Sequence, residues 1–323
     1  MKASQQIFVW IVFALSACQP VPEFVVQIHE CECPPEGRAC ANSFAWKDMV
    51  YIFGGRLSNG EYSNTLMRYS LATDYWESGI ATPLVARVNG VACTNRASVY
   101  VGLGYANVGI YKDSAYLRDW WRYEPDANRW TRLADFPSIK TAAAVAWADE
   151  DYVWVGFGFN GFGDELWRYK VESDEWEAVE HQSVWPKRLM SSVAVEVNGR
   201  YFHGTGFRRQ GQNDWWEFIA ADSHWERRAS LPGAGRHNAA AAATEKACWV
   251  IGGWHYGDPQ SNGYYFADIL RYLPEMDKWY LCGSVPCGAV ENATACAVGN
   301  RLYFGMGESS EGALYEKWYC IEE

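Results

Sequence analysis

The stretch Arg118-Asp119-Trp120-Trp121-Arg122-Tyr123 (RDWWRY), followed by Trp130, is repeated at residues 213–218 as NDWWEF, followed by Trp225. An aromatic residue precedes a Trp by seven positions five times along the chain: Tyr69/Trp76, Tyr123/Trp130, Tyr169/Trp176, Phe218/Trp225 and Tyr272/Trp279. Two residues before each of these Trp stands a residue that bonds readily to its own backbone in turns: Asp74, Asn128, Asp174, Ser223 or Asp277. Each unit therefore predicts a β-hairpin with an aromatic residue on each arm.

A short apolar run that closes on two glycines lies on the N-terminal side of each such motif. The runs are YIFGG (51–55), VYVGLG (99–104), YVWVGFG (152–158), YFHGTG (201–206), WVIGG (249–253) and LYFGMG (302–307). Small residues such as Ala239–Ala243 precede each run, as expected for strands crowded around a central axis. A period of about fifty residues with four strands per unit is typical of a β-propeller. We therefore expect an all-β fold over residues 24–323, with six blades of four antiparallel strands, a to d.

The sixth blade is predicted to be completed by the N-terminal part of the chain. Its strand c ends at Lys317–Cys320, and no fourth strand follows in the sequence. The segment Phe24–Ile28 stands where a strand d belongs, before Pro34 and Pro35. We expect it to pair with Lys317–Cys320, because closing the ring removes the unpaired sheet edge that an open array would expose.

The residues that recur at equivalent positions of the blades, which we call columns, resemble the kelch repeat. In that repeat each blade contains an arginine, a segment of small residues, a glycine pair, an acidic residue beside Trp and a Tyr…Trp pair. The resemblance rests on RDWWRY (118–123) and NDWWEF (213–218) and covers residues 24–323, although four of the six glycine pairs read Gly-x-Gly. It implies a kelch-type propeller like those of bacterial kelch-domain lipoproteins and of galactose-oxidase-like proteins. The tyrosines, histidines and Cys–Tyr crosslink of a copper-radical site have no counterpart that we can place, so we expect no cofactor.

The first 17 residues have the pattern of a signal peptide. Lys2 is followed by the apolar segment Ile7–Leu15, which is too short to span a bilayer as a helix. The tetrapeptide Leu15-Ser16-Ala17-Cys18 resembles a bacterial lipoprotein box, which implies cleavage before Cys18 and a palmitoylated thiol at that residue. An ordinary signal peptide that happens to contain a cysteine is the alternative. Residues 18–23 would then form a linker to the lipid.

The lipoprotein resemblance also implies a location. Cys18 is followed by Gln19 rather than Asp, which among Gram-negative lipoproteins goes with sorting to the outer membrane. We therefore expect a protein of the cell envelope of a Gram-negative bacterium, attached to the membrane through lipid. In this oxidising compartment disulfides can persist.

Composition excludes some classes of partner. The net charge is −11, and the chain contains no cluster of Lys and Arg that could neutralise phosphates, so nucleic acid is not an expected partner. The chain has 18 Trp, 20 Tyr and 14 Phe, and such aromatic richness favours β structure. Its six histidines, His29, His181, His203, His224, His237 and His255, show no metal-ligand spacing. We expect a monomer without a metal, with His203 packed in an inner strand.

Two charged columns lie at one end of the blades. The basic column, near the start of strand a, consists of Arg38, Arg87, Lys140, Arg188 and Arg236. The acidic column, four residues before the strand-c aromatic, consists of Asp119, Glu165, Asp214, Asp268 and Glu316, with Thr65 in blade 1. The two columns could pair with each other, or the basic residues could contact a ligand, and the sequence leaves both possibilities open.

The repeat is interrupted in blades 2 and 5. The distance from the first glycine to the strand-c aromatic is 21 residues in blade 2 (Gly102 to Tyr123) and 20 in blade 5 (Gly252 to Tyr272), against thirteen to fifteen in blades 1, 3, 4 and 6. The b–c loops emerge at one end of the ring, where blades 2 and 5 are opposite each other, so two aromatic loops should face each other across one mouth of the channel. Ordinary drift in loop length is the alternative. The candidate ligand-binding residues are Arg56, Tyr105, Tyr111, Trp254, His255, Tyr264, His237 and Asn238.

The first functional hypothesis is a binding or interaction module whose protein or carbohydrate ligand lies at this mouth. The alternative is a sugar-active enzyme, most simply an isomerase such as a sialic-acid (N-acetylneuraminate) mutarotase or epimerase, whose catalytic residues cannot be carried over to this chain. A structural envelope protein is a third possibility. An enzyme should gather acids and histidines with shifted pKa values in the mouth.

The cysteines form groups with different expected roles. Cys31 and Cys33 belong to the closing segment, together with Cys320, and a bridge from either one to Cys320 is a candidate disulfide. Cys282 and Cys287 flank one d–a loop, and Cys93 and Cys296 lie in inner strands as small apolar residues. The connectivity cannot be read from the sequence.

Overall fold

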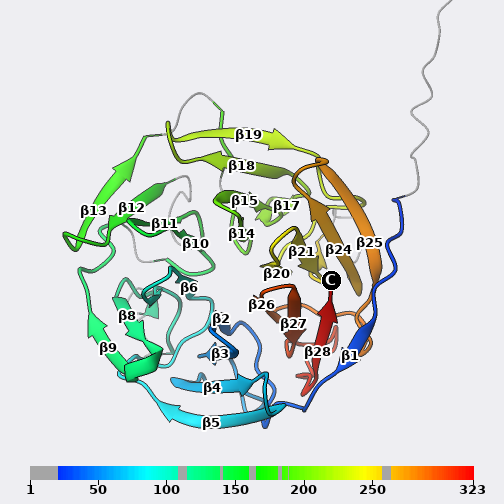
Figure 1. Ribbon diagram of the computed structural model, residues 1–323, viewed down its shortest axis with the longest axis horizontal. Helices are drawn as coiled ribbons and strands as arrows, with labels where there is room; N and C mark the ends of the chain where they lie inside the picture. The colour runs from blue at the N-terminus through cyan, green and yellow to red at the C-terminus, as the bar shows by residue number, and fades with distance from the viewer. Residues whose placement is uncertain are drawn as a thin grey trace, which may run out of the picture.

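A computed structural model describes residues 21–107, 115–138, 141–159, 165–180, 184–187, 189–256 and 263–323. In these residues six four-stranded antiparallel sheets are arranged around a central axis, as Figure 1 shows. This confirms the predicted all-β, six-bladed propeller. A single helical turn, η1 (Pro125–Ala127), lies between strands c and d of blade 2. Cys18, Tyr111, Lys140, His181 and Arg188 lie outside the described residues.

The first three blades follow one another along the chain. Blade 1 contains β2 (Asn42–Trp46), β3 (Met49–Phe53), β4 (Thr65–Ser70) and β5 (Tyr75–Ala81). Blade 2 contains β6 (Val91–Thr94), β7 (Val99–Gly102), β8 (Trp120–Glu124) and β9 (Arg129–Arg132). Blade 3 contains β10 (Val145–Ala148), β11 (Tyr152–Gly156), β12 (Leu166–Lys170) and β13 (Glu175–Val179).

The last three blades include two additional short hairpins and the N-terminal strand. Blade 4 contains β14 (Val193–Val197), β15 (Arg200–Gly204), β18 (Trp215–Ile219) and β19 (His224–Arg228), with the hairpin β16 (Phe207–Arg208) and β17 (Gln210–Gly211) in its b–c loop. Blade 5 contains β20 (Ala240–Ala243), β21 (Cys248–Ile251), β24 (Asp268–Leu273) and β25 (Lys278–Ser284), with the hairpin β22 (Trp254–His255) and β23 (Tyr264–Tyr265). Blade 6 contains β26 (Thr294–Val298), β27 (Arg301–Gly305), β28 (Trp318–Glu322) and β1 (Ile28–Glu30).

The five aromatic pairs are cross-strand pairs of the c–d hairpins. In blade 1, for example, Tyr69 is directly opposite Trp76, and the same register holds in blades 2 to 5. The Tyr69 hydroxyl donates a hydrogen bond of 2.6 Å to Asp74 in the turn, and Asp74 has a left-handed φ of 48°. The carboxylate of Asp74 also accepts a hydrogen bond from the backbone N–H of Glu32, so this turn residue binds the N-terminal segment as well as its own hairpin.

The second glycine of each pair joins one blade to the next. The backbone N–H of this glycine donates to the carbonyl of the following blade in all six joints: Gly55 to Arg87, Gly104 to Thr141, Gly158 to Leu189, Gly206 to Arg236, Gly253 to Val290 and Gly307 to Arg38. At Gly104 φ is +100°, and a Cβ atom there would lie 2.7 Å from the carbonyl oxygen of Val88. Glycine is needed because a side chain would be both strained and too close to the neighbouring backbone.

The three residues of the basic column that the structure describes are buried and bind other groups of the protein. Arg38, Arg87 and Arg236 are among the fully buried side chains. Arg87 makes two hydrogen bonds of 2.7 Å to the carboxylate of Asp119, and Arg236 forms the equivalent two-point pair with Asp268. Buried arginines with these partners cannot contact a ligand, which decides between the two possibilities that the sequence left open.

Two blades depart from the predicted basic column. In the blade joints the position of Arg87 is taken by Thr141 in blade 3 and by Leu189 in blade 4. The predicted Lys140 and Arg188 precede these positions by one residue. The described joints of blades 3 and 4 therefore have no arginine at this position, which spacing alone did not reveal.

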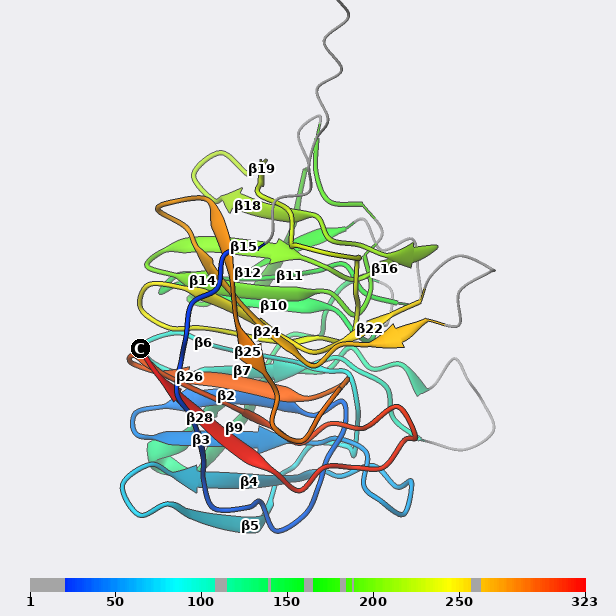
Figure 2. The ribbon, with the colours of Figure 1, turned by 90° about the vertical axis from the view of Figure 1, so that its right-hand side faces the viewer.

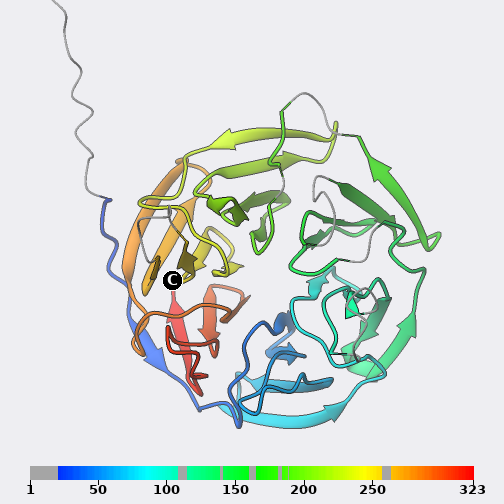
Figure 3. The same ribbon diagram turned by 180° about the vertical axis from the view of Figure 1, so that it is seen from behind.

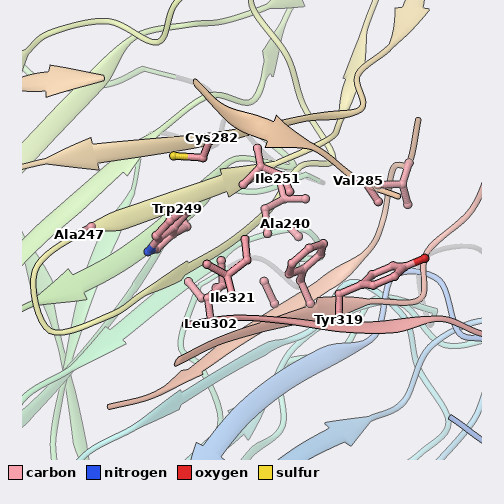
Figure 4. Packing of buried hydrophobic residues seen from close by; sticks show 14 residues of the cluster. Ala240, Ala247, Trp249, Ile251, Cys282, Val285, Leu302, Tyr319 and Ile321 are labelled. Carbon is pink, nitrogen blue, oxygen red and sulfur yellow. The ribbon is translucent and has the colours of Figure 1, made fainter. Parts of the chain in front are cut away.

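The core lies between adjacent blades rather than inside each one. Figure 4 shows the cluster between blades 5 and 6, where Trp249 and Ile251 of β21 pack against Leu302 of β27 and Ile321 of β28. Around the axis, small side chains at the inner strands and directly before them, including Ala144, Ala240 and Ala293, line a cavity of about 200 Å³. Small residues are required there because the six sheets converge.

The N-terminal strand completes the sixth sheet, but with a different extent from the predicted one. β1 begins at Ile28, which pairs with Ile321, and His29 is opposite Cys320. Residues 22–24 instead lie along strand β25 of blade 5. The backbone N–H of Leu281 donates a hydrogen bond to the carbonyl of Pro22, and the carbonyl of Leu281 accepts one from the N–H of Phe24. Figures 2 and 3 show this blue segment running along the outer side of blades 5 and 6. The closing segment therefore contacts two blades.

Candidate functional site

The b–c end of the propeller carries a ring of six equivalent side chains, which we call the rim: Arg56, Tyr105, Phe159, Phe207, Trp254 and Glu308. Each rim residue directly follows the second glycine of its blade. Each also forms an isolated antiparallel bridge with a residue near the start of strand a: Ala39, Val88, Ala142, Met190, His237 or Glu291. The rim is thus aromatic in blades 2 to 5 and charged in blades 6 and 1.

Inside the rim, six residues form a closed ring of backbone hydrogen bonds, which we call the floor: Cys40, Asn89, Ala143, Ser191, Asn238 and Asn292. Each backbone N–H donates to the carbonyl of the floor residue in the preceding blade, with N···O distances of 2.8 to 3.2 Å, and Cys40 closes the circle on Asn292. All six have left-handed φ values between 51° and 57°. Asparagine tolerates this conformation best among residues with a side chain, and it supplies the floor in three blades.

A pocket of about 360 Å³ lies beside the floor between blades 4 and 5. Its lining consists of Met190, Ser191, Phe207, His237, Asn238, Trp254 and Tyr256. Two of these residues, Ser191 and Asn238, also line a cavity of about 140 Å³ at the floor. The ring of His237 lies 5.1 Å from that of Phe207 and 5.0 Å from that of Trp254.

His237 is the polar group of this aromatic pocket. Only 7% of the residue is exposed, and within the part of the chain that the structure describes its Nδ1 atom has no hydrogen-bond partner. Burial, with a smaller contribution from the charge of His255, lowers the pKa of His237 to about 4. The imidazole is therefore neutral near pH 7 and can exchange a hydrogen bond with a ligand.

The charged side of the rim is connected to the pocket through Asn238. The Asn238 amide donates a 2.7 Å hydrogen bond to Glu291, and Asn292 donates one of 2.8 Å to Glu308, which is ion-paired with Arg56. Burial raises the pKa of Glu291, and the negative charge of Glu308 raises it further, while the hydrogen bond from Asn238 opposes the shift. The mouth thus contains one carboxyl group that protonates more readily than a free glutamate.

The comparisons with known proteins agree with this architecture. A family model described as "Kelch motif" matches residues 37–79. Kelch-like protein 23 of Homo sapiens is 27% identical over 257 residues, which are 76% of this chain and 42% of that protein, and its Pongo abelii counterpart is 28% identical over the same shares. N-acetylneuraminate epimerase of Escherichia coli (strain K12) is 24% identical over 232 residues, 69% of this chain and 55% of that protein.

The chain is a kelch-repeat propeller. It spans about half the length of the known relatives that it matches. Kelch propellers commonly serve as interaction modules. Among the residues described for this kelch propeller, no group of three or more His, Cys, Asp and Glu side chains has the arrangement of a metal site, and no helix is long and apolar enough to cross a membrane.

The predicted site residues are distributed over three places in this kelch propeller. Trp254, His237 and Asn238 line the pocket. Arg56 and Tyr105 belong to the rim but lie outside the pocket lining, and Arg56 is already paired with Glu308. The described ends of the b–c loops of blades 2 and 5 lie at the same end of the ring, on opposite blades (Figures 1 and 2).

Two other predicted residues of the blade 5 hairpin do not line the pocket. His255 forms a hydrogen bond through Nδ1 with the carbonyl of Gly235 at 2.6 Å, and its ring contacts that of Tyr264, which is 48% exposed. Tyr111 lies outside the described residues. The pocket wall contributed by blade 4, Met190 and Phe207, was not predicted. Phe207 follows a glycine pair just as Tyr105 and Trp254 do, and this position in the repeat would have identified it.

Proposed function

We propose that this kelch propeller is a carbohydrate-binding module whose ligand occupies the pocket between blades 4 and 5. The observation that carries the proposal is an aromatic pocket with a buried, neutral His237 whose Nδ1 lacks a described partner. A sugar ring has an apolar face that packs on aromatic side chains and hydroxyl groups that exchange hydrogen bonds. The amide of Asn238 and the hydroxyl of Ser191 supply further polar groups at the inner side of the pocket.

A glycan screen followed by calorimetry tests this function. Trp254→Ala removes a partly buried aromatic wall, and loss of such an anchor costs about 2 kcal/mol or more, so affinity should fall roughly thirtyfold. Tyr75→Ala is the control, because Tyr75 is 65% exposed on the outer strand β5, away from the mouth. Failure of the wild-type protein to bind any glycan, or equal binding by the Trp254→Ala variant, would reject the proposal.

A second candidate, the interconversion of sugar anomers, is favoured by Glu291. This carboxyl group has a raised pKa and lies one hydrogen bond from Asn238, next to the neutral His237. Opening and closing a sugar ring requires a proton donor and a proton acceptor. Burial shifts the pKa of Glu291 upward, toward the donor role, and the neutral His237 can accept a proton. The relative named N-acetylneuraminate epimerase suggests the first substrate to test.

The enzymatic candidate is tested by following the anomers of N-acetylneuraminate by NMR after dissolution. The wild-type protein should accelerate equilibration, and Glu291→Gln should abolish the acceleration while the sugar still binds. An unchanged rate in the Glu291→Gln variant, or no acceleration by the wild type, would leave binding as the function.

We also propose that a lipid on Cys18 tethers the propeller to the cell envelope of a Gram-negative bacterium, at the outer membrane. The support is the Leu15–Cys18 tetrapeptide and the residue Gln19 that follows it. The mature protein should partition into detergent and carry the mass of acyl chains, and Cys18→Ala should accumulate as an unprocessed precursor. Mature wild-type protein without acyl chains would contradict the tether.

A further inference from the structure

A second aromatic surface borders the floor in the blades that do not line the pocket. It consists of Tyr62, Tyr105, Tyr116 and Phe159, and we call it the arc. Consecutive ring centroids are 6.3 Å (Tyr62 to Tyr105), 5.0 Å (Tyr105 to Tyr116) and 6.0 Å (Tyr116 to Phe159) apart. Phe159 is 49% exposed, which is unusual for a phenylalanine that already has an aromatic neighbour. The arc extends from blade 1 to blade 3.

The arc and the pocket are connected through the floor. Tyr105 bridges to Val88, the residue before Asn89 of the floor, and Phe159 bridges to Ala142, the residue before Ala143. On the opposite side the pocket lining includes Ser191 and Asn238 of the same floor. The floor therefore borders both the pocket and the arc, and a ligand that extends from the pocket across the floor reaches the arc.

The floor can bind polar groups only through its side chains. Its backbone N–H groups are all used in the closed ring of hydrogen bonds. The floor therefore offers the side chains of three asparagines and one serine, of which Asn238 and Asn292 each already donate one hydrogen bond to a glutamate and keep further donor and acceptor positions. This order of surfaces, aromatic then polar then aromatic, matches a chain of linked sugars, in which each ring has an apolar face and the hydroxyl groups lie at its edges.

We propose that the mouth binds an oligosaccharide of several linked rings, with one end in the pocket and the other on the arc. The inference rests on the proposed carbohydrate-binding function and specifies its ligand class. A single sugar can occupy only one of the two aromatic surfaces. A sugar chain long enough to reach both surfaces makes its second contact while the first holds it in place. Its affinity therefore exceeds the affinity of a sugar that binds to either surface alone.

Calorimetry with cello-, malto- and chito-oligosaccharides of one to six units tests the proposal. In one series affinity should rise at least about tenfold with length and then level off once the arc is reached. Phe159→Ala should remove that gain while the affinity for the single sugar stays unchanged, and Trp254→Ala should weaken binding at every length. The control Tyr75→Ala should behave as the wild type, and the melting temperature of each variant reports whether it folds.

The outcomes separate this inference from the function on which it rests. Affinity that depends on Trp254 but not on chain length, or a length gain that survives in Phe159→Ala, overturns the extended site and leaves the carbohydrate-binding module intact. The absence of binding to every sugar in all three series overturns both.

Discussion

Buried arginines hold the strands of three blades together from the inside. The guanidinium of Arg38 donates to the carbonyls of Gly54 and Thr65 at 2.9 Å, and that of Arg87 donates to the carbonyl of Leu103 at 3.0 Å. These carbonyls stand at the end of strand b and at the start of strand c, where the b–c loop departs. Arginine suits the position because its planar group provides several donors in fixed directions.

Removal of Arg87 should therefore destabilise the fold strongly. Arg87→Ala leaves the largely buried Asp119 carboxylate without its cation, a change that typically costs about 3–5 kcal/mol. Burial raises the pKa of Asp119, but the hydrogen bonds and charge of Arg87 outweigh it and hold that pKa below its ordinary value. Denaturant unfolding measures the change. The control Arg129→Ala breaks an exposed pair with Glu124 and should have little effect, so equal losses in the two variants would contradict this role.

His203 should make the stability of the fold sensitive to acid. Its ring is stacked on Phe157 at 4.3 Å, Nε2 bonds to Ser192 at 2.9 Å, and burial lowers the pKa of His203 to about 3. An unfolded histidine has a pKa near 6.5, so the unfolded state takes up a proton first as the pH falls. Between about pH 6.5 and pH 3 this residue should reduce stability by up to about 1.4 kcal/mol per pH unit.

Unfolding in urea at several pH values tests this prediction. The difference in stability between the wild type and His203→Gln should change across that window in the direction that disfavours the wild type at low pH. A pH-independent difference would mean that His203 does not titrate differently in the two states.

Among the strands, β1 decides how the ring is closed. Its pairing with β28 brings the thiols of Cys31 and Cys320 into hydrogen-bonding contact, whereas Cys33 is exposed. The hydrogen bond from Cys320 lowers the pKa of Cys31, which favours its thiolate, the form that attacks disulfides. The geometry thus prefers Cys31 over Cys33 as the candidate partner of Cys320.

Oxidised glutathione should therefore link Cys31 to Cys320. The Cys31 thiolate attacks the glutathione disulfide and releases one glutathione, and the Cys320 thiol then displaces the second, so two thiols are oxidised and one disulfide is reduced. A bridge that encloses most of the chain should stabilise the fold by about 4–5 kcal/mol. Peptide mass mapping and thermal melting measure both effects. Cys33→Ser should retain the bridge and Cys31→Ser should lose it; two unreacted thiols after oxidation would disprove the link.

At the scale of the whole molecule, the two ends of the described chain meet on blade 5 as well as on blade 6. Arg271 of β24 is ion-paired with Glu323 at 2.5 Å, and its guanidinium lies 4.5 Å from the ring of Phe24. Both members of the ion pair are nearly buried. The ring is therefore closed by strand pairing in blade 6 and by a shared arginine contact in blade 5, in addition to the hydrogen-bonded floor at the mouth.

Deletion of residues 19–30 should open this closure. The variant loses β1 and the Phe24 contact, exposes the edge of β28 and uncovers part of the apolar cluster that Ile28 covers. We expect the melting temperature to fall by roughly 5 °C or more. A chain that lacks only residues 19–21 keeps these contacts and should melt like the wild type. Equal melting temperatures for all three proteins would mean that closure does not depend on β1.

The sequence by itself determined the number of blades, the four-strand unit, the c–d hairpins and the end of the ring at which the b–c loops emerge. These features follow from short-range spacing, because a Tyr and a Trp seven residues apart, such as Tyr69 and Trp76, meet in every blade through the same hairpin. A pair of residues that meets within one hairpin has the same neighbours in every blade, so its packing role can be predicted without the tertiary structure.

Only the tertiary structure decided which of the candidate residues share a pocket, what the buried arginines bind, and where β1 begins. Phe207 and Trp254 come from different blades, and Arg87 meets Asp119 across 32 positions of sequence. The β1 register depends on contacts between Ile28 and Ile321, at opposite ends of the described chain. The pocket and the ring closure occur once, and the arginine–aspartate pair recurs only in blades 2 and 5, where Asp268 takes the place of Asp119. The geometry of all three depends on how six sheets twist and converge around one axis.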